Sequence, residues 1–357
     1  MQMKSFGTPL KVEKIAQSRI GEVDFQTLNF GKEFTDHMMV STFKDGQWSI
    51  PEIKPYQNLS LAPSARVFHY GQEVFEGMKA YKDDQDKVWL FRPMDNFNRI
   101  NISSKRLAMP EFREDYFCDG LSKLLELDQE WIKPGKENSL YIRPFVIATE
   151  AGVAASPANE YMFIIICSPV QSYYAGEVRV KIAEKFSRAA QGGTGYAKAG
   201  GNYAGSFYPA QEAQKEGFQQ IVWTDAYTHE YIEEAGTMNI FIRIGNKLIT
   251  GPTSDSILDG ITRRSLIQIA RDNSIDLEVR PIKISEVIEA HKNGDLFEMF
   301  GAGTAAVVSP IAGFGYKGET YELKGVTDNY SDKFKKIITD IQYNRSNDPY
   351  GWRVAAF

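Results

Sequence analysis

The stretch GGTGYAKAGGNYAGS, from Gly192 to Ser206, bears most directly on the fold and chemistry of this chain. A single lysine, Lys198, stands among glycines and alanines, which remove side-chain bulk on both sides of it. That suits a position where a flat ring approaches the backbone, and a lysine in such a setting can lose its proton and form a Schiff base. The same letters also fit a mobile glycine-rich loop with an exposed lysine. A Walker phosphate loop is excluded, because Ala197 and Ala199 stand where that motif needs Gly and Ser or Thr.

The segments around this stretch mix strands and helices without a strict alternation. Ser139–Ala148 and Tyr161–Ser168 are predicted as buried strands, and Glu114–Leu127 as an amphipathic helix. Ser168–Glu177, with a Pro, a Gly and no periodicity, is the best candidate for a linker. We therefore expect an α+β fold of two domains that meet at a cleft. The expected division is a small N-terminal domain over 1–170, a linker over 171–178, and a large C-terminal domain over 179–357 that carries Lys198.

Further elements are predicted from periodicity and turn residues. They are a helix over Asn98–Leu107, strands over Val178–Ala183 and Gln220–Thr224, a hairpin of Met238–Ile244 and Lys247–Thr250 around Gly245-Asn246, helices over Thr262–Asp272 and from a Ser285 cap through His291, and strands over Leu296–Phe300 and Thr304–Ser309 around a glycine turn.

Composition excludes several function classes. The 357 residues are 43% hydrophobic, as in a globular protein, and carry a formal net charge of -5, so neither a polyanion partner nor a nucleic acid is expected. No apolar run reaches membrane-spanning length, and Met1–Leu10 has no apolar core of the kind a signal peptide needs. Cys118 and Cys167 are far apart and the four histidines are scattered, so neither a disulfide framework nor a metal site is expected. The expected location is the cytoplasm.

The segment EEAGTMNIF, from Glu233 to Phe241, joins two strand-like stretches. Taken alone, a carboxylate followed by Ala-Gly-Thr fits an ordinary turn. It also fits a carboxylate placed against a pyridine nitrogen, which would keep that nitrogen protonated so that the ring can accept electrons.

Two glycine-containing segments could face an anion. In LDGITRR, Gly260 precedes a helix that begins near Ile261–Thr262, and the free N–H groups of a helix start favour a phosphate, although every helix has such an end. GAGTAA, from Gly301 to Ala306, matches a dinucleotide fingerprint, but the following TAAVVSP is typical of a strand rather than the helix that a Rossmann turn must open.

In SLYIRPF, from Ser139 to Phe145, strand periodicity puts Tyr141 and Arg143 on one face. An arginine lying on an aromatic face is a good receptor for a carboxylate. The alternative is a surface cation that rests on a tyrosine.

Taken together, these segments resemble the branched-chain aminotransferases of the fold-type-IV pyridoxal-phosphate enzymes. The resemblance runs over nearly the whole chain, through FEGMKAY, YIRPF, GGNY, EAGTMNIF, DGITRR and FGAGTAAVVSP in the family's order and spacing. It implies a two-domain fold like that of D-amino-acid aminotransferase, with the active site at the domain interface. It also implies pyridoxal 5′-phosphate as cofactor, and transamination of leucine, isoleucine and valine with 2-oxoglutarate by a homodimer or a higher assembly of dimers.

The resemblance implies the following roles. Lys198 forms the Schiff base and moves the proton, Glu234 holds the ring nitrogen, and Tyr203 holds the ring hydroxyl. Arg99, the backbone of Ile261 and Thr262, and Thr304 hold the phosphate. Thr237 and the backbone at Thr304–Ala305 take the substrate carboxylate. Phe30, Tyr70, Phe75, Tyr141 and Tyr173 wall the side-chain pocket. Independently of the resemblance, we expect Arg143 to lie on Tyr70 and Tyr141 and to receive the side-chain carboxylate of an acidic substrate. Where some relatives have a CxxC pair, this chain has Ala306 and Ser309, so no thiol switch is expected.

D-amino-acid aminotransferases and aminodeoxychorismate lyases share this lysine and glutamate, but the aromatic wall and the YIRP strand argue against them. A non-catalytic ligand-binding relative is opposed by the intact Lys198, Glu234 and Tyr203. A dehydrogenase would need an acidic residue for the ribose at the expected distance, and none is evident.

Overall fold

The computed structural model describes residues 1–135, 137–171 and 178–357, and these form two compact units. Of the described residues, the first unit comprises 1–135, 137–171, Ala197–Gly200 and Asp340–Phe357, and the second comprises 178–196 and Gly201–Thr339. The expected division differs at two places, because Lys198 and the C-terminal segment pack with the first unit. Ala199 forms a bridge to Val74, and the last strand pairs with a strand of the first sheet.

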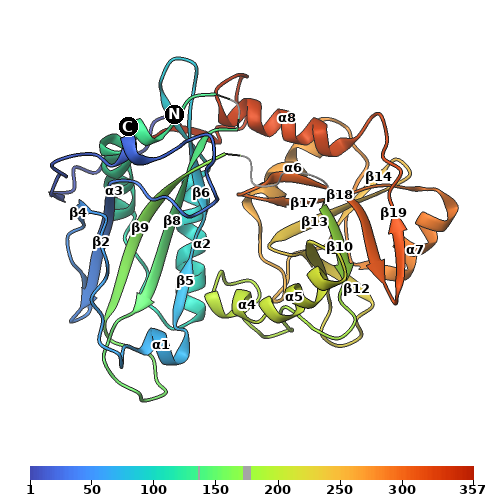
Figure 1. Cartoon of the computed structure of the whole chain (residues 1–357), viewed down its shortest axis with the longest axis horizontal. Coiled ribbons are helices and arrows are strands. Elements are labelled where there is room, and N and C mark those ends of the chain that lie inside the picture. Colours follow the sequence, from blue (N-terminus) through green and yellow to red (C-terminus); the bar gives the residue numbers. More distant parts are fainter. Residues whose placement is uncertain (136, 172–177) are drawn as a thin grey trace. The chain divides into compact units, whose positions relative to one another are not determined.

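The first unit is built on one mainly antiparallel sheet (Figure 1). Its strands, in spatial order, are β1 (Lys11–Val12), β4 (Glu52–Pro55), β2 (His37–Lys44), β9 (Tyr161–Val170), β8 (Ser139–Ala148), β6 (Met78–Lys82), β7 (Val88–Phe91) and β20 (Arg353–Ala355), with β3 (Gln47–Trp48) on β2 and β5 (Glu73–Phe75) on β8. The helices are α1 (Arg66–Tyr70), α2 (Pro93–Arg106) and α3 (Glu114–Leu127). The helix predicted over Glu114–Leu127 and the strand over Ser139–Ala148 are confirmed to the residue.

The core of the first unit lies between this sheet and the apolar stripe of α3, which buries Phe117, Leu121 and Leu124 completely. Phe112 and Phe163 stack with ring centroids 3.7 Å apart in the same core. Burial of apolar surface stabilises a fold by about 25 cal/mol per Å², so this aromatic packing contributes to the stability of the sheet.

The strands of the second unit close on themselves. Because β12 (Tyr231–Ala235) pairs with both β11 (Gln220–Thr224) and β13 (Met238–Ile244), a ring runs through β13, β17, β18, β10, β11 and β12. The other members of the ring are β10 (Val178–Ile182), β17 (Leu296–Gly303) and β18 (Val307–Tyr316). Outside it lie β14 (Lys247–Thr250), β15 (Leu277–Val279), β16 (Ile282–Lys283) and β19 (Glu319–Glu322). The remaining helices are α4 (Gly200–Ala204), α5 (Phe207–Lys215), α6 (Ile261–Asp272), α7 (Ile284–Asn293) and α8 (Tyr330–Gln342).

Two local predictions for the second unit are wrong. Ser285 does not cap α7, because the helix already begins at Ile284. The N-cap position is Lys283, whose backbone is extended. The glycines Gly301 and Gly303 do not form the turn after β17. They lie inside that strand, where the side chain of Met238 occupies the space that a Cβ would need, and the turn falls on the next three residues, Thr304–Ala306. The hairpin around Gly245-Asn246 and the helix after Gly260 are confirmed.

Candidate functional site

Lys198 is held by the first unit through its backbone. Its N–H donates to Ser103 Oγ at 2.9 Å, and its carbonyl accepts from the N–H of Phe75 at 3.0 Å. The ammonium Nζ lies 4.9 Å from the centroid of the Phe75 ring. Gly200 is closely packed, because a Cβ there would lie 2.0 Å from Oε2 of Glu73. Ala197 and Ala199 are buried and Lys198 is half-buried, so this part of the segment does not carry a fully exposed lysine.

A buried ion pair lies next to this lysine. Glu76 accepts from Arg99 Nε at 2.6 Å and from Arg99 Nη2 at 3.0 Å, and both side chains are almost fully buried. Oε2 of Glu76 also accepts from Asn96 Nδ2 at 2.7 Å and from the N–H of Gly77 at 3.0 Å. Burial raises the pKa of Glu76, but the charge and hydrogen bonds of Arg99, the charge of Lys198 and the bond from Asn96 outweigh it and leave that pKa below its usual value.

Arg143 lies on aromatic rings, as the strand periodicity of β8 predicts. Its Nη2 donates to the hydroxyl of Tyr141 at 2.9 Å, and its guanidinium carbon lies 4.6 Å from the Phe75 ring centroid and 5.2 Å from that of Tyr141. Phe30 meets the Tyr141 ring edge-on at 5.0 Å. Nε of Arg143 is buried and has no hydrogen-bond partner among the residues that the structure describes. One cation thus lies in an aromatic setting with an unsatisfied donor.

One expected member of this pocket stands apart from that cluster. Tyr70 is 46% exposed, and its hydroxyl donates to the carbonyl of Val153. The ring that stacks on Arg143 beside Tyr141 is therefore Phe75, whereas Tyr70 had been expected there. Tyr173 lies outside the described residues.

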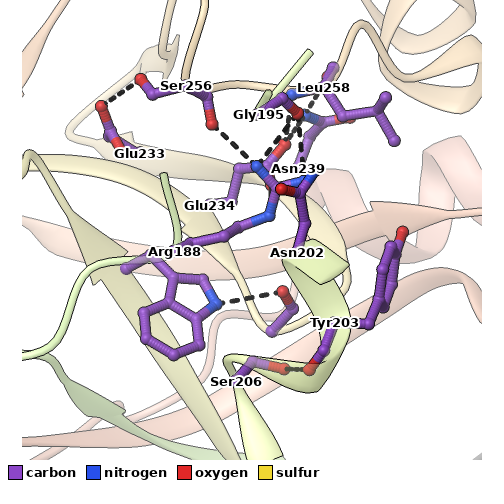
Figure 2. A network of polar contacts seen from close by, with 12 residues as sticks. Arg188, Gly195, Asn202, Tyr203, Ser206, Glu233, Glu234, Asn239, Ser256 and Leu258 are labelled. Atoms are coloured by element: carbon purple, nitrogen blue, oxygen red, sulfur yellow. Dashed lines mark hydrogen bonds and ion pairs between the residues drawn. The ribbon is translucent and has the colours of Figure 1, made fainter. Parts of the chain in front are cut away.

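The second unit holds Glu234 in a set of donors (Figure 2). Its Oε2 lies 2.9 Å from Arg188 Nε, and its Oε1 accepts from the N–H of Leu258 at 2.8 Å and from Asn239 Nδ2 at 3.1 Å. Arg188 is fixed in turn by the carbonyls of Gly195 and Ser256. Arg188 thus places a positive charge against this buried carboxylate, an arrangement that suits an acceptor for a protonated ring nitrogen.

The neighbouring Glu233 faces a different partner, because adjacent strand residues point to opposite faces. It accepts from the hydroxyl of Ser256, and its Oε2 is buried with no partner among the described residues (Figure 2). Burial raises the pKa of Glu233. The two adjacent carboxylates therefore differ in their environment, since Glu234 forms an ion pair with Arg188, whereas burial is the largest influence on the pKa of Glu233.

The first turn of α6 is buried, and its start lacks a side-chain cap. Ile261 and Thr262 are its first residues, and Gly260 before them provides no side-chain cap. The first N–H groups of a helix have no partner within the helix. A Cβ on Gly260 would lie 1.8 Å from Oδ1 of Asn239, so only glycine allows the backbone to pass this close to the donors of Glu234.

Four more expected residues lie at turns or on a short helix of the second unit. Thr237 follows Gly236, at φ +59°, in the turn between β12 and β13, and Thr304 and Ala305 lie in the turn between β17 and β18. Tyr203 is on α4, whose end is tied by a bond from Ser206 Oγ to the Tyr203 carbonyl at 2.6 Å.

Glu76 and Arg188 are site residues that sequence reasoning missed. A signal was present for Glu76, since a charged residue inside the apolar run VFEGM must be paired if it is buried. For Arg188 there was none, because it lies in the irregular stretch before the glycines and its partner is distant in sequence.

Within residues 1–135, 137–171 and 178–357, no group of His, Cys, Asp and Glu side chains could hold a metal ion. In the same residues, no helix combines the length and the apolar character needed to cross a bilayer.

Residues 73–314 match the family model for amino-transferase class IV. The chain is 45% identical to branched-chain-amino-acid aminotransferase 2 of Bacillus subtilis (strain 168), over 92% of each chain. It is 43% identical to branched-chain-amino-acid transaminase 1 of the same organism, over 93% of this chain and 95% of the other. Among solved structures, it is similar to the branched-chain aminotransferase of Thermoproteus uzoniensis, with a TM-score of 0.74 and 24% identity, over 90% of this chain and 100% of the other. At that identity the last likeness concerns the fold alone.

Proposed function

From the premise that this chain belongs to the amino-transferase class IV family, we propose that it transfers the amino group of leucine, isoleucine and valine to 2-oxoglutarate. The products are the branched 2-oxo acids and L-glutamate. The chain is a branched-chain-amino-acid aminotransferase, and its cofactor is pyridoxal 5′-phosphate. The second substrate and the roles of individual residues are the substance of the proposal.

The residues fit this cofactor. When bound, pyridoxal phosphate supplies an electron sink for the bonds at the substrate's Cα. Lys198 would hold the cofactor through its amine and would move the proton at the substrate's Cα. Glu234, paired with Arg188, would accept a hydrogen bond from the N–H of the ring. Tyr203 would donate to the ring hydroxyl.

The phosphate and the substrate carboxylate take the remaining groups. We assign the phosphate to Arg99, the N–H groups of Ile261 and Thr262 at the start of α6, and Thr304. We assign the binding of the substrate carboxylate to Thr237 and to the backbone at Thr304–Ala305. The wall of the side-chain pocket is assigned to aromatic residues, namely Phe30, Tyr70, Phe75, Tyr141 and Tyr173.

The setting of Arg143 is the observation that carries 2-oxoglutarate as the second substrate. A pocket for leucine must be apolar, yet the same pocket must accept the side-chain carboxylate of glutamate, which is costly to bury unpaired. The guanidinium carbon lies over the Phe75 ring, and the buried Nε has no hydrogen-bond partner among the described residues. Another solved branched-chain aminotransferase, with 23% identity and a TM-score of 0.71, is described in complexes with N-(5′-phosphopyridoxyl)-L-glutamate and with 4-methylvaleric acid. These two ligands carry an acidic and an apolar side chain, the two kinds of side chain that a pocket containing Arg143 would accept.

The test is single-turnover spectroscopy of the cofactor-loaded protein. Leucine should convert the cofactor to its amino form, and 2-oxoglutarate should then restore the original spectrum, whereas oxaloacetate and pyruvate should restore it much more slowly. Borohydride should fix the cofactor on a peptide within Gly192–Ser206. Label on another lysine would defeat the role of Lys198, and equal rates for all three oxo acids would defeat that of 2-oxoglutarate.

We also infer a homodimer, or a higher assembly of dimers, in the cytoplasm. The exposed apolar side chains of Phe68, Tyr70 and Val153 support a partner for the first unit, and the free, buried thiols of Cys118 and Cys167 support a reducing compartment. Light scattering during gel filtration measures the assembly, and a single-chain mass would contradict it.

A further inference from the structure

The buried pair of Glu76 and Arg99 carries an inference about how the cofactor site is held, and it rests on the phosphate role proposed for Arg99. We propose that Glu76 is a positioning residue, which fixes the guanidinium of Arg99 in the orientation that receives the cofactor's phosphate. Glu76 itself would touch neither the cofactor nor the substrate.

The contact between the two side chains fixes both the plane and the direction of the guanidinium. Oε1 takes Nε at 2.6 Å and Oε2 takes Nη2 at 3.0 Å, so the carboxylate lies along one edge of the planar fork. Two parallel bonds restrict rotation about the end of the arginine side chain, which a single bond would not. Nη1 is not part of this pair, and the paired edge determines where the Nη1 edge points.

Glu76 is itself held, so it can serve as a fixed reference. Its Oε2 also accepts from Asn96 Nδ2 at 2.7 Å and from the Gly77 N–H at 3.0 Å. Asn96 is secured by a second bond, to the carbonyl of Gly77 at 3.2 Å. The side chain of Glu76 is 1% exposed, so water offers it no alternative partner. The orientation of Arg99 therefore derives from the backbone between β5 and β6.

A competing role for Glu76 predicts the opposite sign. Lys198 and Arg99 place two positive charges near this one carboxylate. If Glu76 acted only as a nearby negative charge, it would weaken the attraction for a phosphate, and removing its charge would tighten phosphate binding. If it acts by positioning, its removal loosens Arg99 and weakens phosphate binding.

Two substitutions separate position from charge. In Glu76→Gln, the amide oxygen can take the place of Oε2 and keep the bonds from Arg99 Nη2, Asn96 and Gly77. Its NH₂ then faces the N–H of Arg99 Nε, so the bidentate contact is lost together with the charge. Glu76→Asp keeps the charge, but its side chain is shorter by one methylene group. The carboxylate then lies too far from Arg99 to form the two hydrogen bonds.

The measurement is the binding of pyridoxal 5′-phosphate and of pyridoxal, which lacks the phosphate, to each apoenzyme by absorbance titration. The ratio of the two dissociation constants reports the phosphate contribution alone. Partners that orient metal ligands typically contribute about 10- to 100-fold to affinity, and we expect the phosphate preference to fall by a similar factor in both Glu76 variants. Glu298→Gln is the matched control, since Glu298 forms another buried pair, 3.1 Å from Arg243. It should lower the unfolding temperature but leave the preference unchanged.

The outcomes are distinguishable. A tighter or unchanged phosphate preference in Glu76→Gln, or wild-type behaviour of Glu76→Asp, would overturn the positioning role. If Glu76→Gln does not fold, Glu76→Asp decides by itself. Arg99→Met tests the underlying assignment. If it keeps the phosphate preference, the proposed role of Arg99 fails. If it loses the preference while both Glu76 variants keep it, only the inference about Glu76 fails.

Discussion

Replacing Arg143 by methionine should impair the acidic substrates far more than the apolar ones. The guanidinium donates one bond to the Tyr141 hydroxyl at 2.9 Å and has a further buried donor, Nε, for which the described residues offer no partner. A charge-assisted hydrogen bond to a substrate carboxylate contributes about 1.5–3 kcal/mol. Its loss should lower kcat/KM for glutamate and 2-oxoglutarate about 10- to 150-fold.

Leucine should be much less affected by the same change. The side chain of leucine would pack against the guanidinium of Arg143 in the wild type. In the variant it would pack against the methionine side chain, which offers a similar apolar surface. The stacking on Phe75, with the guanidinium carbon 4.6 Å from the ring centroid, is worth about 0.5–1 kcal/mol, so kcat/KM for leucine should change about fivefold or less.

The assay follows each half-reaction separately through the cofactor spectrum, so that one slow half does not hide the other. Tyr141→Phe is the companion variant, because it removes the hydroxyl that orients the guanidinium and keeps the charge. It should show the same selectivity with a smaller loss. If Arg143→Met slows leucine and glutamate equally, Arg143 is structural and the idea of one pocket for both side chains is refuted.

Three further outcomes are expected. Glu234→Gln keeps the shape of the buried side chain but removes its charge, so kcat should fall on the order of 100- to 1000-fold. Glu233→Gln is the control and should change kcat little. If steady-state assays show equal losses of kcat for both variants, the role of Glu234 is structural. Burial raises the pKa of Cys118 to about 12 and that of Cys167 well above its usual value, so neither thiol should react with iodoacetamide at pH 8 before denaturation, and mass spectrometry of the native protein checks this. Burial raises the pKa of Asp225, but its hydrogen bonds from backbone N–H groups lower it to about 2, below the value of about 3.9 in the unfolded chain. Asp225 therefore stabilises the fold above about pH 4 and loses this effect as the pH falls toward 2. Asp225→Asn should lower the unfolding temperature at pH 7, with the gap narrowing in melts below pH 4, and a constant gap would argue against this charge effect.

Local patterns predicted much of the fold because they needed only neighbouring residues. The helix over Glu114–Leu127 has an apolar stripe, and the strand over Ser139–Ala148 has strand periodicity and bulky apolar residues, so both were placed to the residue. The strand Arg353–Ala355 was not predicted, because its three residues are too short for a period and are fixed by pairing with β7.

The site shows the same limit. Lys198 stood out because its small neighbours are adjacent in sequence, and the structure gives the reason at Gly200, where a side chain would collide with Glu73. The partners of buried charges did not stand out. Glu76 and Arg99 are 23 residues apart and Arg188 and Glu234 lie still farther apart, and no spacing rule identifies pairs that only the folded sheets bring together. The mistaken glycine turn at Gly301 has a similar cause, since the side chain of Met238 that requires small residues there comes from another strand.

The return of the C-terminal segment to the first sheet has a consequence for biosynthesis on the ribosome. β7 is synthesised long before its partner β20, and Ala356 beside β20 is fully buried in the core of the first unit. The first unit therefore cannot complete its sheet until β20 has left the ribosome, and the edge of β7 stays open until then. Nascent chains that stall before β20 emerges would expose that edge, so they should bind chaperones more strongly than chains that include β20.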